Sequence, residues 1–405
     1  MNRVERRATF ALALIMACRM LGLFMILPFF SLYTNQLPGG TPLLIGVALG
    51  AYGLTQACFQ LPMGALSDRI GRKPTIYLGL AVFALGSLIA AMSHSIYGII
   101  LGRALQGAGA IGSTVMALAT DLTRETCRSQ ALAILGITIA LAFVTAMLLG
   151  PWLNTWIHLN GIFWLICALA GLGMLLLNRL VPTPPSLTAD LHEKNAARHW
   201  QVLKQANLQR LYVGVFCLHS ILTLLFIGLP ILLSEHGHLD THQQTVFYIK
   251  VLPLAFILMA PLLRWSEKNK KLTQCFPALI LLLCLALGVL DTQTVSLTVS
   301  PTVSPTWIAA CVCVFFIAFT WLEAAMPALV AKYAPAAQKG TAMGLYSTAQ
   351  FSGIFIGGIL GGAALGHGGF QQVFLVATII GLAWFVQNLR GHQLRKGLDE
   401  SNLRQ

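Results

Sequence analysis

Four residues that can carry a charge lie inside stretches that are otherwise apolar and long enough to cross a bilayer: Arg19, Arg103, His219 and Glu323. A charge in the middle of such a stretch costs about 2.5–3.5 kcal/mol on insertion scales, so these side chains are expected to face a cavity or a partner. Burial favours the neutral forms of carboxyl and imidazole groups. We therefore predict that Glu323 and His219 carry protons, with Arg19 and Arg103 in the same coupling network. A static ion pair for Glu323 and a packing hydrogen bond for His219 are the alternatives.

A second group of charges forms a short island between two apolar segments. Its glycines and charged residues are Gly64, Asp68, Arg69, Gly71, Arg72 and Lys73. The cations have a simple explanation, because cytoplasmic loops of membrane proteins collect Lys and Arg. That rule does not explain a carboxylate at the end of an apolar helix, bracketed by glycines. We therefore predict a conformational device at Asp68, with a solvated loop charge as the alternative.

Polar residues also recur at helical spacing within the apolar segments. One stripe, with a period of four residues, consists of Tyr52, Gln56 and Gln60. In another segment, Arg103 and Asp121 are separated by five helical turns, so a continuous helix would bring them to one face about 27 Å long, with Gln106 near it. Both stripes predict the lining of a cavity. Hydrogen bonding between packed helices is the alternative.

The elements that position these residues follow from hydropathy. The 405 residues are 57% hydrophobic and only 10% charged, whereas soluble domains contain roughly 25% charged residues. Many apolar blocks reach the length that a membrane-spanning helix requires. The sequence therefore predicts an all-α polytopic membrane protein with twelve spans, at 9–33, 43–66, 74–93, 96–120, 130–154, 159–180, 209–234, 244–264, 272–291, 306–331, 340–365 and 371–390.

The basic excess, a formal charge of +13, is distributed in a way that argues against nucleic acid. All Lys and Arg except Arg19, Arg103 and Lys250 fall in segments that we assign to one face, which is a topology signal rather than a binding surface. An even number of spans puts both termini on that face, the cytoplasm. None of the nine Cys forms a pair in the opposite loops, so no disulfide framework is expected.

The segment 181–208 is polar and proline-rich, and it divides the spans six and six. We interpret it as a cytoplasmic linker between a bundle at 1–180 and a second bundle with a short tail at 209–405. The two halves repeat weakly at an offset of about 200 residues, since Arg19 precedes Pro28 as His219 precedes Pro230. A parallel six-span repeat implies a pseudo-twofold axis along the membrane normal and a substrate cavity between the halves.

The island at 64–73 resembles motif A of the major facilitator superfamily, and residues 103–110, Arg-x-x-Gln-Gly-x-Gly-Ala, resemble motif B of its proton-coupled drug exporters. The similarity continues through residues 339–351, which include Tyr346 and Gln350. The resemblance implies a pseudo-symmetric major facilitator fold in a bacterial inner membrane. It also implies that Tyr346 and Gln350 line the substrate cavity. Some members of this family carry a soluble C-terminal domain, which we do not expect after the tail at 391–405.

The resemblance further implies a latch that favours the outward-facing state. In it, Asp68 contacts the N-terminus of the eleventh span near Gly340, and Arg72 pairs with Asp121. Motif C, an antiporter mark, survives only as Gly150-Pro151. That departure weakens the antiport assignment but not the transporter assignment.

We therefore predict a secondary active transporter, a monomer rather than an enzyme, that exports drug-like or amphipathic small molecules in exchange for protons. Proton-coupled transport of a specific metabolite or organic anion is the main alternative, and a non-transporting membrane sensor is the third. The sequence contains no nucleotide-binding P-loop, and we expect no cofactor. The loop at 235–242, with Glu, Asp and three His, could hold a metal, but a polar surface loop is the preferred interpretation and no metal site is predicted.

Overall fold

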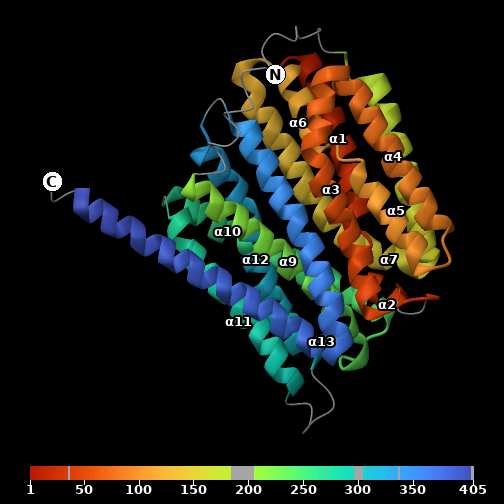
Figure 1. Ribbon diagram of the computed structural model, residues 1–405, viewed down its shortest axis with the longest axis vertical. Coiled ribbons are helices and arrows are strands. Elements are labelled where there is room, and N and C mark those ends of the chain that lie inside the picture. Colours follow the sequence, from red (N-terminus) through yellow and green to blue (C-terminus); the bar gives the residue numbers. More distant parts are fainter. Residues whose placement is uncertain (35–36, 184–204, 270, 296–303, 336–337, 403–405) are drawn as a thin grey trace.

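The computed structural model describes residues 1–34, 37–183, 205–269, 271–295, 304–335 and 338–402, and within these ranges every regular element is a helix. The first half contains α1 (Arg3–Phe24), α2 (Phe30–Thr34), α3 (Pro42–Ile70), α4 (Arg72–Met92), α5 (Ile96–Ala108), α6 (Gly112–Asp121) and α7 (Glu125–Leu180) (Figure 1). The second half contains α9 (Ala206–Glu235), α10 (Thr241–Lys268), α11 (Leu272–Val295), α12 (Pro305–Tyr333) and α13 (Lys339–Asn402). Nine of the described helices are long and apolar enough to cross a membrane, in agreement with the predicted all-α polytopic class.

The predicted spans and the observed helices differ in how they are joined. Helix α7 contains the fifth and sixth predicted spans, joined at His158, whose backbone is not helical (φ 53°, ψ −178°). Helix α13 contains the eleventh and twelfth, joined at Gly368 and Gly369. The first predicted span is interrupted by turns at 25–29, where Pro28 has no N–H to donate to a helix.

The fourth predicted span is also interrupted, and this corrects one inference from spacing. Helix α5 ends before α6 begins, and Gly109 lies between them. A Cβ atom at Gly109 would lie 2.3 Å from the carbonyl oxygen of Gly79, so the break occurs where the backbone passes unusually close to α4. Arg103 and Asp121 are therefore on two different helices, and the continuous 27 Å face expected from five regular turns does not exist.

Burial follows the pattern of a protein that is surrounded by lipid. Large apolar side chains such as Phe10, Ile137 and Trp156 are 66%, 62% and 71% exposed. The polar side chains of Arg19 and Gln56 are instead buried among the helices. Because lipid tails solvate apolar groups, helix packing here depends on close contact and on polar groups inside rather than on hiding hydrophobic surface from water.

The first part of α13 lies along the boundary between the halves, with α3 on one side and α9 on the other (Figure 1). Small residues allow this double contact. A Cβ atom at Gly358 would lie 2.4 Å from the carbonyl oxygen of Gly46 on α3, and one at Gly357 would lie 2.5 Å from that of Ser220 on α9. The glycine-dense stretch of the eleventh span thus brings three helix backbones together, as small residues do at membrane helix interfaces.

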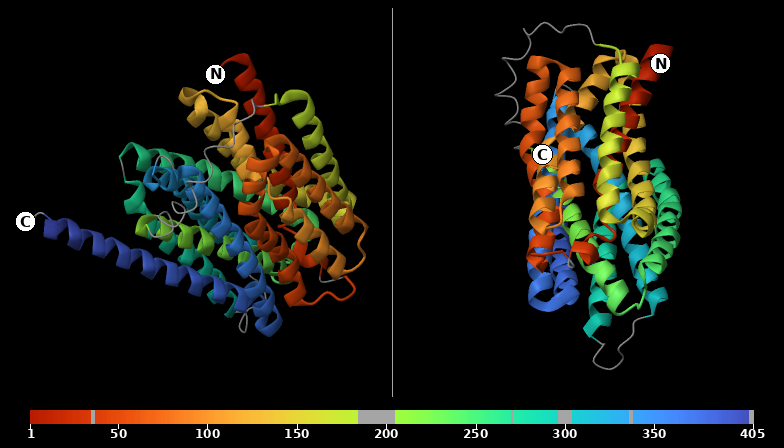
Figure 2. Two further views of the ribbon diagram at one scale, coloured as in Figure 1. Left: turned by 45° about the horizontal axis from the view of Figure 1, so that its top comes forward. Right: turned by 90° about the vertical axis from the view of Figure 1, so that its right-hand side faces the viewer.

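The contact between α3 and α13 loosens along its length. We name the end of the molecule that carries the N-terminus and the α3–α4 junction the N-terminal face, and the end that carries α2 the opposite face (Figure 2). Near the opposite face, a Cβ atom at Gly362 would lie 2.6 Å from the carbonyl oxygen of Pro42. Further along, at Gly344, the nearest neighbour is the side chain of Leu61 at 3.5 Å, and at Gly340 nothing lies within 4 Å. The two halves are therefore tightly joined at the opposite face and separate toward the N-terminal face.

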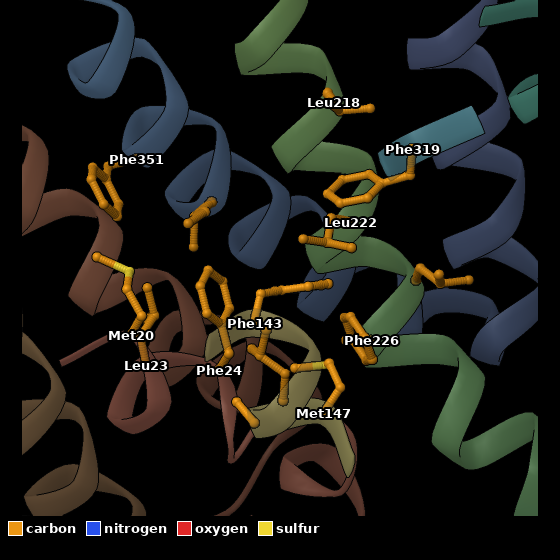
Figure 3. Packing of buried hydrophobic residues seen from close by; sticks show 14 of the residues in the cluster. Met20, Leu23, Phe24, Phe143, Met147, Leu218, Leu222, Phe226, Phe319 and Phe351 are labelled. Carbon is orange, nitrogen blue, oxygen red and sulfur yellow. The ribbon is translucent and has the colours of Figure 1, made fainter. Parts of the chain in front are cut away.

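Buried apolar side chains fill the space between the halves near the middle of the molecule. Figure 3 shows Met20 and Phe24 of α1 and Phe143 of α7 facing Leu222 of α9 and Phe319 of α12. The predicted linker at 181–208 lies mostly outside the described residues, so the bounds of the two bundles stay a prediction.

Candidate functional site

The charged island joins three helices of the first half through one arginine. Gly71 separates α3 from α4 with φ +97°, a backbone conformation that favours glycine. Arg72, directly after it, donates to the carboxylates of Asp68 on α3 and Asp121 on α6, the latter at 3.1 Å from Nε. The Arg72–Asp121 pair that the family resemblance implied is therefore present, and both side chains are less than one-fifth exposed.

The other island residues have simpler surroundings. Lys73 donates from Nζ to the carbonyl oxygen of Val181 at 2.8 Å, which ties the start of α4 to the end of α7. Arg69 is exposed, and Gly64 lies next to the hydroxyl of Ser113. Sequence reasoning missed Ser67, whose hydroxyl accepts from Arg72 at 2.6 Å and donates to the carbonyl oxygen of Gly64 at 2.7 Å.

The expected contact between Asp68 and the start of the eleventh span is not formed. A Cβ atom at Gly340 would meet no atom within 4 Å, and the carboxylate of Asp68 binds Arg72 instead. The reason is the separation of α3 from α13 toward the N-terminal face. The latch that the resemblance implied would require a conformation in which these two helix ends approach each other, which they do not do in this structure.

Arg19 is buried in the first half and is bound through uncharged groups. Its Nη2 donates to the amide oxygen of Gln56, whose Nε2 donates to Gln60 at 2.7 Å. The guanidinium carbon lies 6.0 Å from the ring centre of Phe83. The predicted stripe on α3 therefore exists, but in this conformation both glutamines are buried: Gln56 binds the cation and Gln60 binds Gln56, rather than forming an exposed lining.

Arg103 is the second buried cation of the first half. Its Nη1 donates to Gln106 at 2.9 Å, and Gln106 in turn donates to the hydroxyl of Ser87 at 2.9 Å. The guanidinium carbon lies 4.8 Å from the ring centre of Tyr52, within the range of a cation–π contact. Ser87 was not predicted, because a single serine in an apolar span gives no periodic signal.

Three titratable or polar residues of the second half meet through Gln350. The Nδ1 atom of His219 lies 3.2 Å from the carbonyl oxygen of Val215, which can only accept, so we assign the ring proton to Nδ1. Nε2 then accepts from the side-chain amide of Gln350 at 2.8 Å, and the same amide lies 3.3 Å from Oε1 of Glu323. Oε2 of Glu323 is 3.7 Å from Nε2 of His219.

Glu323 is more accessible than its neighbour His219. Its side chain is 35% exposed, whereas His219 is 2% exposed. Tyr346, one turn before Gln350 on α13, is buried, and no hydrogen bond partner of its hydroxyl is found among the described residues. A carboxyl group and an imidazole can both bind a proton, and the amide between them can change its hydrogen bonds when one of them does.

Aromatic contacts cross the boundary between the two polar groups. Tyr52 of α3 and Phe351 of α13 lie 6.1 Å apart by ring centres, and Phe143 of α7 is stacked on Phe319 of α12 at 6.2 Å. Phe319 also packs on the ring of His219. Sequence reasoning did not identify this layer, because phenylalanines are common in every span and only the fold selects those that face the partner half.

The polar loop after α9 has structural roles in this conformation. Asp240 accepts from the backbone N–H of Gln243 at 2.7 Å and caps α10, and the ring of His236 packs on Phe370 at 5.0 Å. Among the described residues, no three His, Cys, Asp or Glu side chains lie close enough together to hold a metal ion.

Comparison with known proteins gives consistent results. The chain matches the Major Facilitator Superfamily over residues 12–318 and 292–392. It is 44% identical over 386 residues to the inner membrane transport protein YajR of Escherichia coli, which covers 94% of this chain and 82% of that protein. It is 26% identical over 386 residues to the multidrug resistance protein MdtH of Aeromonas salmonicida, with 94% and 93% covered.

Among solved structures, the fold is similar to a bacterial homologue of the human lysosomal transporter Spinster in an inward-facing, unoccupied conformation. The TM-score is 0.72 at 14% identity, with 96% of this chain and 98% of that chain covered. At this identity the likeness concerns the fold alone. The helix arrangement, the charged island and the match over most of the length agree, and the chain belongs to the major facilitator superfamily of membrane transporters.

Proposed function

We propose that this chain is a secondary active transporter that exports drug-like or amphipathic small molecules in exchange for protons. It would do so as a monomer in a bacterial inner membrane, with both termini in the cytoplasm. The name of the relative YajR supports the membrane, and that of the more distant relative MdtH supports the substrate class. The concentration of Lys and Arg in the predicted loops of one face supports the orientation.

With this orientation, the structure corresponds to the inward-facing state of an alternating-access cycle. The opposite face, closed by α3 and α13, would be periplasmic, and the N-terminal face would open to the cytoplasm. Asp68 would then exchange partners during the cycle. It binds Arg72 in this state and would reach the N-terminus of α13 when the cytoplasmic ends close, where helix dipoles favour anions by roughly 0.3–1 kcal/mol.

The observation that carries the proton coupling is the position of Glu323. Its side chain is partly exposed, and its Oε2 atom lies 3.7 Å from Nε2 of His219; this oxygen is buried and has no hydrogen bond partner among the described residues. An ionised carboxylate in a span is attracted to cations in the facing half, whereas a protonated one is not. Arg19 and Arg103 are such cations. Proton uptake at Glu323 would therefore change the attraction between the halves. Proton-coupled transport requires such a link between protonation and the equilibrium of the two conformations.

The proposal is tested with the purified chain reconstituted into lipid vesicles in the inside-out orientation, with the N-terminal face outside. The lumen of these vesicles is made acidic. An exchanger makes the lumen less acidic when a substrate is added outside, whereas a symporter makes it more acidic. Glu323→Gln is expected to abolish this substrate-dependent pH change. Glu267→Gln, which removes an exposed carboxylate at the end of α10, is the matched control and should leave it unchanged. A normal proton response in Glu323→Gln contradicts the proposal.

A further inference from the structure

Two buried arginines from two different helices contact consecutive turns of α3. Arg19 of α1 and Arg103 of α5 are each 1% exposed. Arg19 donates to Gln56 of α3, and Arg103 lies over the ring of Tyr52, four residues earlier on α3. Side chains four residues apart on a helix are neighbours. The two guanidinium groups therefore belong to one positively charged region beside α3.

The partners of these arginines use only part of each guanidinium group, and those partners are uncharged. Arg19 donates from Nη2, whereas its Nε and Nη1 atoms have no hydrogen bond partner among the described residues. Arg103 donates from Nη1, and Nε and Nη2 are likewise without a partner there. Nε and Nη2 form one edge of the guanidinium plane, with two parallel N–H bonds. That edge is the one that binds the two oxygens of a carboxylate.

Among the described residues, no carboxylate forms an ion pair with either of these two arginines in this conformation. The first 180 residues contain four acidic side chains, each of which is paired with an arginine outside this region: Glu5, Asp68, Asp121 and Glu125. Glu323 of the second half lies next to His219 and Gln350 instead. A buried cation without a counter-charge is strongly unfavourable, and two in one region are more so, which favours the entry of an anion.

We propose that the transported molecule is an amphiphile with a carboxylate, and that Arg103 and Arg19 bind this carboxylate from inside the first half. This proposal rests on the transport function proposed above and specifies its substrate class. The hydroxyl of Tyr52, which is buried and without a partner among the described residues, provides a further donor beside Arg103. The apolar body of the molecule would lie against the buried apolar side chains between the halves, which include Met20 and Phe24 of α1 and Phe351 of α13 (Figure 3).

The test compares three probes with the same phenyl-alkyl body and different charge: 4-phenylbutanoate, its neutral amide and 4-phenylbutylamine. Their binding to the purified full chain in detergent is measured by calorimetry. Hydrogen bonds to a charged group predict that the carboxylate binds on the order of 10- to 100-fold more tightly than the amide. Arg103→Gln and Arg19→Gln should remove this preference. Lys250→Gln, which removes an exposed cation of α10, is the control and should retain it.

A third variant covers the case in which a glutamine variant does not fold. Arg103→Lys keeps the positive charge but lacks the two-pronged edge, so it should bind the carboxylate more weakly than the wild type and more tightly than Arg103→Gln. Size-exclusion chromatography and thermal melting establish which variants are folded. The proposal is overturned if the carboxylate does not bind more tightly than the amide, or if its preference survives in the arginine variants.

Transport assays separate this proposal from the one before it. If the wild type transports the amine or the amide in exchange for protons but shows no preference for the carboxylate, proton-coupled export is supported and the anion site is refuted. If the carboxylate binds through the two arginines but no probe moves protons, the anion site stands and proton coupling does not.

Discussion

Replacement of Gly46 by alanine is expected to weaken the contact between α3 and α13 near the opposite face. It should shift the protein toward a conformation in which that face is open and the N-terminal face is closed. An added Cβ atom would lie 2.0 Å from the carbonyl oxygen of Gly358, where ordinary contact begins at 3.4 Å. The backbones of α3 and α13 would have to move apart by about 1.4 Å at this point, and both are rigid helix backbones. Overpacking of this kind costs about 1–3 kcal/mol, which corresponds to a change of roughly 5- to 150-fold in the ratio of two conformers.

The conformational change is measured between spin labels at the other end of the same two helices. Cysteines that replace Ile70, at the end of α3, and Lys339, at the start of α13, carry the labels in a background without the nine native cysteines. Because the helices separate toward this end in the structure, the wild type should show a long distance. Gly46→Ala should add a population with a shorter distance, as the N-terminal face closes when the opposite face opens.

Gly171→Ala is the matched control for the added methyl group. A Cβ atom at Gly171 would have no neighbour within 4 Å, and the position is an exposed part of a helix. This variant should leave the distance distribution unchanged and slightly favour its helix. An unchanged distribution in Gly46→Ala, with a normal melting temperature, would refute the reasoning. Lower stability without a change in distance would show that the contact stabilises the fold but does not set the conformation.

Three further predictions concern acidic residues at the N-terminal face. Asp68→Asn should fold and insert but lose transport, because its amide neither pairs with Arg72 nor favours a helix N-terminus as a carboxylate does; normal uptake rates in vesicles would contradict this. Asp121→Asn should lower the melting temperature, since Arg72 loses a hydrogen bond to a charged group worth about 1.5–3 kcal/mol in part-buried surroundings, and equal melting curves would show that the pair contributes nothing. Glu5→Gln should increase proteolysis near the start of α1, because Glu5 accepts from both the side chain and the backbone of Arg124, and an unchanged cleavage pattern would exclude that anchoring role.

Hydropathy and charge alone locate the spans and the residues that cannot be inert within them. Transfer of apolar residues into a bilayer is a local property, so hydropathy located the twelve spans without knowledge of their packing. The same local cost singled out Arg19, Arg103 and Glu323, since a charge in a span is expensive wherever the span lies. The pairing of Arg72 with Asp121 followed from the family resemblance, and it is formed within one half of the molecule.

The contacts between residues distant in sequence, and the choice of which face is closed, depend on how the helices pack. The bridge from Gln350 to His219 and Glu323 joins three helices, and the break at Gly109 depends on the approach of α4. The expected partner of Asp68 was wrong for this conformation for a related reason. Two arrangements of the same halves differ by only a few kcal/mol in total, so the balance depends on contacts such as Gly46 against Gly358. No local pattern in the sequence reports a difference of that size between surfaces that meet only after folding.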